Sequence, residues 1–156
     1  MTNLTEHTRL TLVGLLVGCL AIVGCGGGES KPADMPTLYP VSLKFTQEGQ
    51  PCAGAFVILV PQDDSKWSTG GLTDADGVAL LKTQGKYPGI AAGKYKITAF
   101  KRETGSDGRS YNLINPDYVG AAKTTFTLEV TAGKNQFEPF DLGKPVRELV
   151  VDVATY

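Results

Sequence analysis

The chain has 156 residues, with 15 Lys and Arg against 16 Asp and Glu, one His and three Cys. This length allows one domain with a sizeable core. The near-neutral balance gives no electrostatic reason to expect binding to nucleic acid or to an anionic membrane surface.

Residues 10–25 form an uncharged, mostly apolar stretch that follows Arg9 and leads directly into three glycines, residues 26–28. The stretch is shorter than the roughly 20 apolar residues that a membrane-spanning helix needs. A basic start, a short apolar core and a small residue before the cut are typical of a secretory signal. We therefore predict export. An uncleaved amino-terminal anchor and simple secretion are the alternatives.

The end of this stretch, Ile22-Val23-Gly24-Cys25, resembles the lipobox of bacterial lipoproteins. The resemblance implies removal of residues 1–24, a diacylglycerol on the Cys25 thiol and an acylated new amino terminus. A similar match ends at Cys19, but cleavage there would leave a signal core of only about nine residues and expose residues 20–23. The expected location is the cell envelope. Gly26, in place of Asp, favours the outer membrane under the usual bacterial sorting rule, where such a membrane exists.

Residues 25–37 have the Gly- and Pro-rich composition of a flexible linker. After the linker, apolar residues recur with the period of two that is typical of strands. The expected strands cover residues 41–46, 56–60, 78–81, 94–99, 125–131, 137–142 and 148–153. The continuous apolar run 56–60 predicts a central strand buried on both faces, and residues 103–123 predict a long loop. Residues 38–156 should therefore form one antiparallel β-sandwich of seven to eight strands.

Three segments in this order resemble the carboxypeptidase regulatory-like, or transthyretin-like, domain. They are Gly-Gln-Pro-Cys-Ala-Gly-Ala before a strand that ends in Pro61, Thr73-Asp-Ala-Asp-Gly77, and Ala92-Gly-Lys-Tyr-Lys-Ile-Thr98. Ala92 stands where the family usually has Pro. The resemblance covers roughly residues 40–101 and implies a β-sandwich of the kind found on bacterial lipoproteins.

The sequence argues against catalysis after export, because its one histidine, His7, lies in the predicted signal. Without histidine there is no Ser-His-Asp or Cys-His mechanism and no common zinc site. We interpret Cys52 as a packing residue, Asp74-Ala75-Asp76-Gly77 as a hairpin turn rather than a calcium loop, and Asp63-Asp64 as a solvated loop. No cofactor and no metal are expected.

Two hypotheses of function remain. The first is a non-catalytic interaction module at the cell envelope, held to membrane lipid through acylated Cys25, with an envelope protein as a possible partner. The second is a module that binds a glycan or a small ligand through exposed aromatic residues. Its candidate residues are Trp67, which lies in a polar segment, and Tyr111 and Tyr118, which lie in the predicted loop. The alternative for these three is structural: Trp67 would cap the core and the tyrosines would fix the loop.

Overall fold

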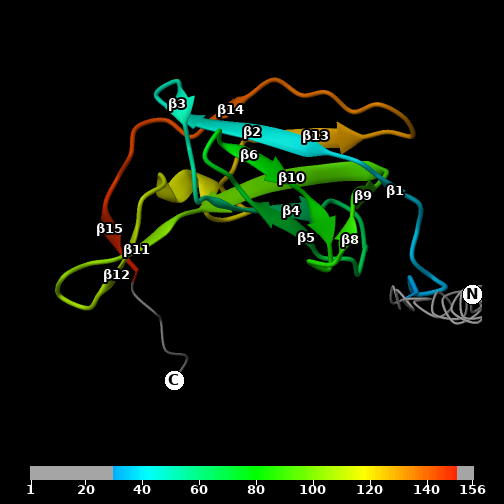
Figure 1. The fold of residues 1–156 in the computed structure, drawn as a ribbon, viewed down its shortest axis with the longest axis horizontal. Coiled ribbons are helices and arrows are strands. Elements are labelled where there is room, and N and C mark those ends of the chain that lie inside the picture. Colours follow the sequence, from blue (N-terminus) through cyan, green and yellow to red (C-terminus); the bar gives the residue numbers. More distant parts are fainter. Residues whose placement is uncertain (1–29, 151–156) are drawn as a thin grey trace, which may run out of the picture. The chain divides into compact units, whose positions relative to one another are not determined.

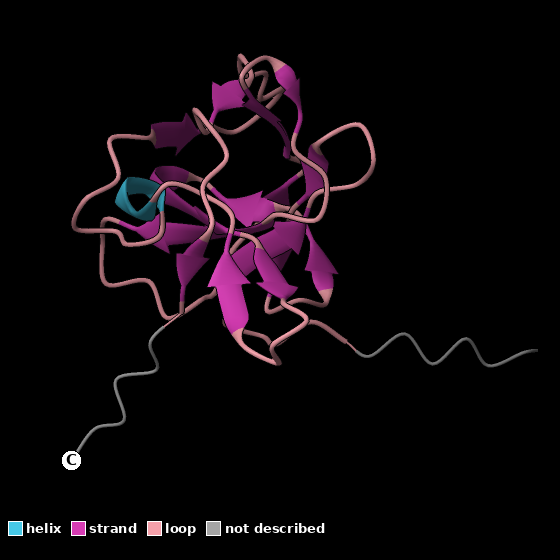
Figure 2. Ribbon diagram, turned by 90° about the vertical axis from the view of Figure 1, so that its left-hand side faces the viewer, coloured by secondary structure: helices cyan, strands magenta, loops and turns pink. Residues whose placement is uncertain are grey.

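The computed structural model describes residues 30–150, and the compact unit begins at Pro32. The predicted signal, Cys25 and the last predicted strand residues, 151–153, lie outside the described residues. The compact unit is an all-β sandwich, as predicted, and η1 (Pro116–Tyr118) is the helical turn of its described part (Figure 2).

The larger layer of the sandwich is a six-stranded antiparallel sheet in the order β13-β10-β4-β5-β7-β8. Its strands are β4 (Phe56–Pro61), β5 (Thr69–Leu72), β7 (Lys82–Thr83), β8 (Tyr87–Pro88), β10 (Gly93–Phe100) and β13 (Thr127–Val130). The longest of these, β10, lies between β4 and β13 (Figure 1). The strands predicted at residues 56–60, 94–99 and 125–131 are confirmed, and the structure shows that they are neighbours in one sheet.

The second layer is built around β2 (Ser42–Gln47). Its partners are β3 (Gln50–Pro51), β6 (Val78–Leu80) and β14 (Phe140–Asp141). The pairing of β14 with β2 is parallel, which departs from the purely antiparallel arrangement predicted. A short pair is formed by β1 (Leu38–Tyr39) and β9 (Ile90–Ala91). The remaining strands, β11 (Arg102–Thr104), β12 (Ser110–Asn112) and β15 (Glu148–Leu149), form a separate three-stranded sheet.

The core lies between the two layers and is filled by alternate residues of the long strands, as their period of two predicts. The fully buried side chains include Leu43 and Phe45 from β2, Val57 and Leu59 from β4, and Ile97 from β10. A row of aromatic rings closes one side of the core. Its contacts run from Tyr118 to Phe126, from Phe126 to Phe140, and from Phe140 to Phe45.

The predicted turn at residues 74–77 is confirmed, and its chemistry is local. One carboxylate oxygen of Asp74 accepts hydrogen bonds from the backbone N–H groups of Asp76 and Val78, at 3.0 and 2.9 Å. Gly77 has a φ of +75°, which a residue with a side chain adopts only with strain. A Cβ at Gly77 would also clash with the carbonyl oxygen of Phe45. The turn therefore needs Asp and Gly for structural reasons.

The prediction that residues 56–60 are buried on both faces is wrong. Val57 and Leu59 point into the core, whereas Phe56 is exposed and Ile58 and Val60 are half-buried. The run is central in its sheet, but the second layer covers only one face of β4. The apolar character of the other face therefore calls for a different explanation.

The predicted long loop at 103–123 is also corrected. The segment contains the hairpin β11–β12, whose turn includes Asp107 and Gly108, and then η1. The strands of the hairpin carry exposed or half-buried residues, so they lack an apolar alternation. The strand predicted at 137–142 is shorter than expected, because only β14 forms there. In the strand predicted at 148–153, Leu149 is exposed rather than buried.

Candidate interaction surfaces

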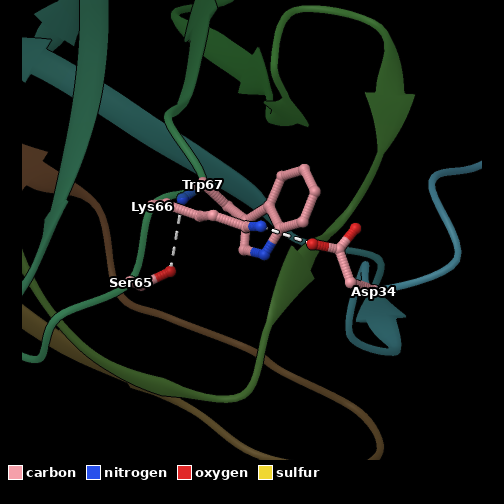
Figure 3. A network of polar contacts seen from close by, with 4 residues as sticks. All are labelled: Asp34, Ser65, Lys66 and Trp67. Carbon is pink, nitrogen blue, oxygen red and sulfur yellow. Dashed lines mark hydrogen bonds and ion pairs between the residues drawn. The ribbon is translucent and has the colours of Figure 1, made fainter.

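Trp67 lies in the connection between β4 and β5 and is half-buried. The ammonium of Lys66 lies 5.0 Å from the centre of its ring, and the same ammonium forms an ion pair with the Asp34 carboxylate (Figure 3). The backbone N–H of Trp67 donates a hydrogen bond to the Ser65 hydroxyl at 3.4 Å. These contacts join the segment before β1 to the β4–β5 connection. Asp34 has a lowered pKa because it accepts a hydrogen bond from Lys66.

Tyr111 lies on β12 and is enclosed by charged side chains. The Arg147 guanidinium lies 3.5 Å from the centre of its ring, and its hydroxyl donates to the Asp107 carboxylate at 2.6 Å. Arg147 also forms an ion pair with Glu103 at 3.5 Å. The hydrogen bond from Tyr111 lowers the pKa of Asp107, and the same bond raises the pKa of Tyr111. This cluster connects β11 and β12 to the residue just before β15.

Tyr118 lies in η1 and stacks on Phe126, with ring centres 4.6 Å apart and planes nearly parallel. The structure therefore gives Trp67, Tyr111 and Tyr118 three different sets of neighbours and does not bring them together on one face. Figure 1 shows the hairpin that carries Tyr111 at the opposite end of the large sheet from β8 and β9. These three residues therefore form no continuous aromatic platform.

Cys52 is buried beside β3, and its thiol donates a weak hydrogen bond to the Gln47 side-chain oxygen at 3.4 Å. Burial raises the pKa of the thiol, which lowers the fraction of reactive thiolate. Asp63 accepts a hydrogen bond from the Ser65 backbone N–H, so it also serves its own loop. Within residues 30–150 no group of three or more His, Cys, Asp or Glu side chains is placed to hold a metal ion.

The sequence did not reveal the most open apolar surface, which lies on the outer face of β4 and β5 in the large sheet and continues onto β6 of the second layer. Of the five large apolar side chains that are exposed in the described residues, three lie together here. They are Phe56, Leu72 and Leu80, with 41%, 61% and 69% of their surface exposed. They border a hollow of about 560 Å³ that is also lined by Ile58 and Lys82. We call this surface the apolar face.

A second hollow, of about 600 Å³, lies beside β2 and β6 and has a polar lining. Ser42, Lys44 and Glu138 contribute to it, together with Asn135. The Asn135 side chain holds the 131–135 turn through hydrogen bonds to the backbone of Thr131. No described side chain in this hollow is both charged and buried, so the hollow presents an ordinary solvated surface.

No helix in the part of the chain that the structure describes is long and apolar enough to cross a membrane. Comparison of the chain with protein-family models, with curated proteins and with solved structures found no match.

Proposed function

We propose that this chain is a lipid-anchored lipoprotein of the cell envelope whose β-sandwich acts as a non-catalytic interaction module. The observation that carries the proposal is the segment Leu10–Cys25, with its short apolar core and its lipobox-like end. A diacylglycerol on the Cys25 thiol carries two acyl chains and the acylated amino terminus adds a third, and two or more chains hold a protein stably on a bilayer.

The chemistry of the described residues supports a non-catalytic role. The thiol of Cys52 is buried and its pKa is raised, so it is a poor nucleophile. The Asp74 carboxylate is engaged by backbone amides of its own turn. Because the chain has no histidine after residue 7, the commonest general base for hydrolysis is missing from the sandwich sequence.

The resemblance to a carboxypeptidase regulatory-like domain supports the same proposal. The ordered motifs that resemble a carboxypeptidase regulatory-like domain coincide with structural positions: Gly54 has a φ of +72° at the turn into β4, and Ala55 behind it is fully buried. We therefore assign these residues to the fold and not to a reaction. Because Trp67, Tyr111 and Tyr118 form no shared surface, stacking on a glycan is not the function we propose.

Metabolic labelling with a radioactive fatty acid tests the proposal. The full chain should be labelled and should sediment with membranes, whereas Cys25→Ala should lose both the label and the sedimentation. The matched control is Cys19→Ala, which should be labelled like the parent. Equal labelling of the parent and Cys25→Ala would contradict acylation at this position.

A further inference from the structure

The apolar face is built by strand register. In the antiparallel pairs of the large sheet, Phe100 faces Phe56 and Phe56 faces Leu72, so their side chains lie on the same side. Leu72 and Leu80 are the next facing positions beyond the paired residues Thr73 and Ala79. Four apolar side chains thus form one row across β10, β4, β5 and β6, and the rings of Phe100 and Phe56 have centres 5.3 Å apart.

The hollow lies beside this row and is lined by a glycine of β5. In the next register, Ile58 faces Gly70 and Gly70 faces Lys82. Gly70, which lies between Ile58 and Lys82, also lines the hollow of about 560 Å³. Lys82 is the one charged residue of the lining and has no ion-pair partner among residues 30–150.

Exposing apolar side chains to water is unfavourable in free energy. Leu72 and Leu80 leave more than half of their surface exposed, and clustered apolar residues of this kind mark sites of contact with a protein, a ligand or a membrane. The apolar face does not contribute to the hydrophobic core at β4, because the second layer packs on the opposite side of this strand, against Val57 and Leu59. A molecule that covers this face would therefore come from outside the sandwich.

The position of the tether argues for one occupant. Asp34 is held by Lys66 in the β4–β5 connection, and Ser68 of the same connection lines the hollow. Eight residues lie between Cys25 and Asp34, and the nine steps from one Cα to the next span at most about 32 Å when the chain is fully extended. An acyl group on Cys25 would thus hold the apolar face within reach of the bilayer at all times, at a high effective concentration.

We infer that the apolar face docks on the lipid surface to which the chain is tethered, with Leu72 and Leu80 inserted at the boundary between headgroups and acyl chains. This inference rests on the proposed lipid anchor. Lys82 is placed to reach lipid phosphates at the edge of the face, and Arg102, which lies 5.6 Å from the ring centre of Phe100, does the same at its other end.

The charges around the face are mixed, because Asp74 and Asp76 lie in the turn next to Leu72 and Leu80. Docking should therefore depend on apolar contact more than on net charge. It should occur on zwitterionic phosphatidylcholine vesicles and persist in high salt, which screens exposed charges.

Trp67 provides the test, because it is the one tryptophan of the chain and lies next to Ser68 at the edge of the hollow. The full chain, produced in a bacterial host and purified with its lipid, is reconstituted into phosphatidylcholine vesicles with or without bromine on the upper acyl carbons. The brominated lipids should quench Trp67 fluorescence. The double variant Leu72→Ser/Leu80→Ser should still float with the vesicles but show quenching at least about twofold weaker.

The matched control is Leu149→Ser, which removes an exposed leucine from β15, outside the apolar face. It should be quenched like the parent. A parent that carries the fatty-acid label and floats, but whose Trp67 is unquenched, would overturn the docking and leave the anchor in place. Equal quenching of the parent and the double variant would do the same. An unlabelled parent that does not float would overturn the anchor, and the docking with it.

Discussion

The two faces of the large sheet carry apolar side chains of the same types, but the second layer covers only one of these faces. On β4, Val57 and Leu59 are fully buried against the second layer, while Phe56 and Ile58 on the opposite side border an open hollow. The difference between the two faces of β4 arises from the second layer, because β2 and its partners pack against one side of β4 only. An apolar strand therefore identifies a central strand but does not reveal which of its faces the protein covers.

The same contrast separates two kinds of contribution to the molecule. Side chains on the inner face should determine the free energy of unfolding, and those on the apolar face should contribute to binding with little effect on folding. Pairs of matched substitutions, one at a buried and one at an exposed position, test this difference.

The largest difference is expected between two leucines. Leu59→Ala removes a fully buried side chain from the middle of the core and should lower the free energy of unfolding by about 2–5 kcal/mol. Leu80→Ala removes the same atoms from an exposed position and should change it by less than about 0.5 kcal/mol. Urea unfolding of both variants measures the difference. Similar losses would mean that the outer face is packed in solution.

Two glycines give the next largest contrast. Gly77→Ala places a Cβ against backbone atoms of Phe45 and Cys52 at a positive φ, and should destabilise the fold by about 2 kcal/mol or more. Gly85→Ala lies at the rim of the apolar face with a φ of +67° and open space around it. It should cost only about 1 kcal/mol, which is the conformational penalty alone.

The Gly77→Ala and Gly85→Ala pair is measured by the shift in thermal midpoint relative to the parent. If both substitutions shift it equally, the close approach of the 74–77 turn to β2 contributes nothing beyond backbone conformation.

The third largest effect on stability is expected from removing the buried hydroxyl of Thr73. The Thr73 side chain donates to the carbonyl of Cys52 at 2.6 Å and accepts from the backbone N–H of Ala55 at 2.8 Å. Thr73→Val keeps the shape but leaves both buried groups without this partner, so it should cost about 1–3 kcal/mol in urea unfolding. Thr127→Val, at an exposed position of β13, should stay within about 0.5 kcal/mol. A neutral Thr73→Val would indicate that water satisfies both groups.

The sequence was sufficient for those strands in which burial alternates. Leu43 and Phe45 in β2, and Tyr95 and Ile97 in β10, are buried as their period of two predicts. β5 was missed because Gly70-Gly71 breaks the alternation, although these glycines allow close approach of neighbouring backbone. Because the row across the apolar face depends on β5, the surface itself could not be predicted.

The hairpin β11–β12 was missed for a different reason. Its strands are polar, so they show no alternation of apolar residues that would predict a strand. However, Asp107-Gly108 is a turn signal from which the hairpin could have been predicted. The long-range contact between Arg147 and Tyr111 joins residues 36 positions apart, and nothing in the local pattern indicates it. The three aromatic candidates were chosen for polar surroundings in sequence, which do not report on neighbours in space.

The smallest expected effect concerns this hairpin, which belongs to neither face of the large sheet. The Tyr111 hydroxyl is the first cause of the lowered pKa of Asp107, followed by the backbone N–H of Arg109. A carboxyl with a lowered folded-state pKa stabilises the fold above its unfolded pKa, and this contribution is lost as the pH falls through the folded-state value. Tyr111→Phe should therefore raise the pKa of Asp107 towards its ordinary value, which an NMR titration of the carboxyl carbon measures. Tyr118→Phe changes a tyrosine whose ring stacks on Phe126 and which has no contact with Asp107, so it should leave the pKa of Asp107 unchanged.

Because Asp107 is exposed, solvent screens the interaction, so the unfolding midpoint of Tyr111→Phe at neutral pH should remain near that of the parent. A large loss of stability in this variant would instead show that the three-stranded sheet folds together with the core.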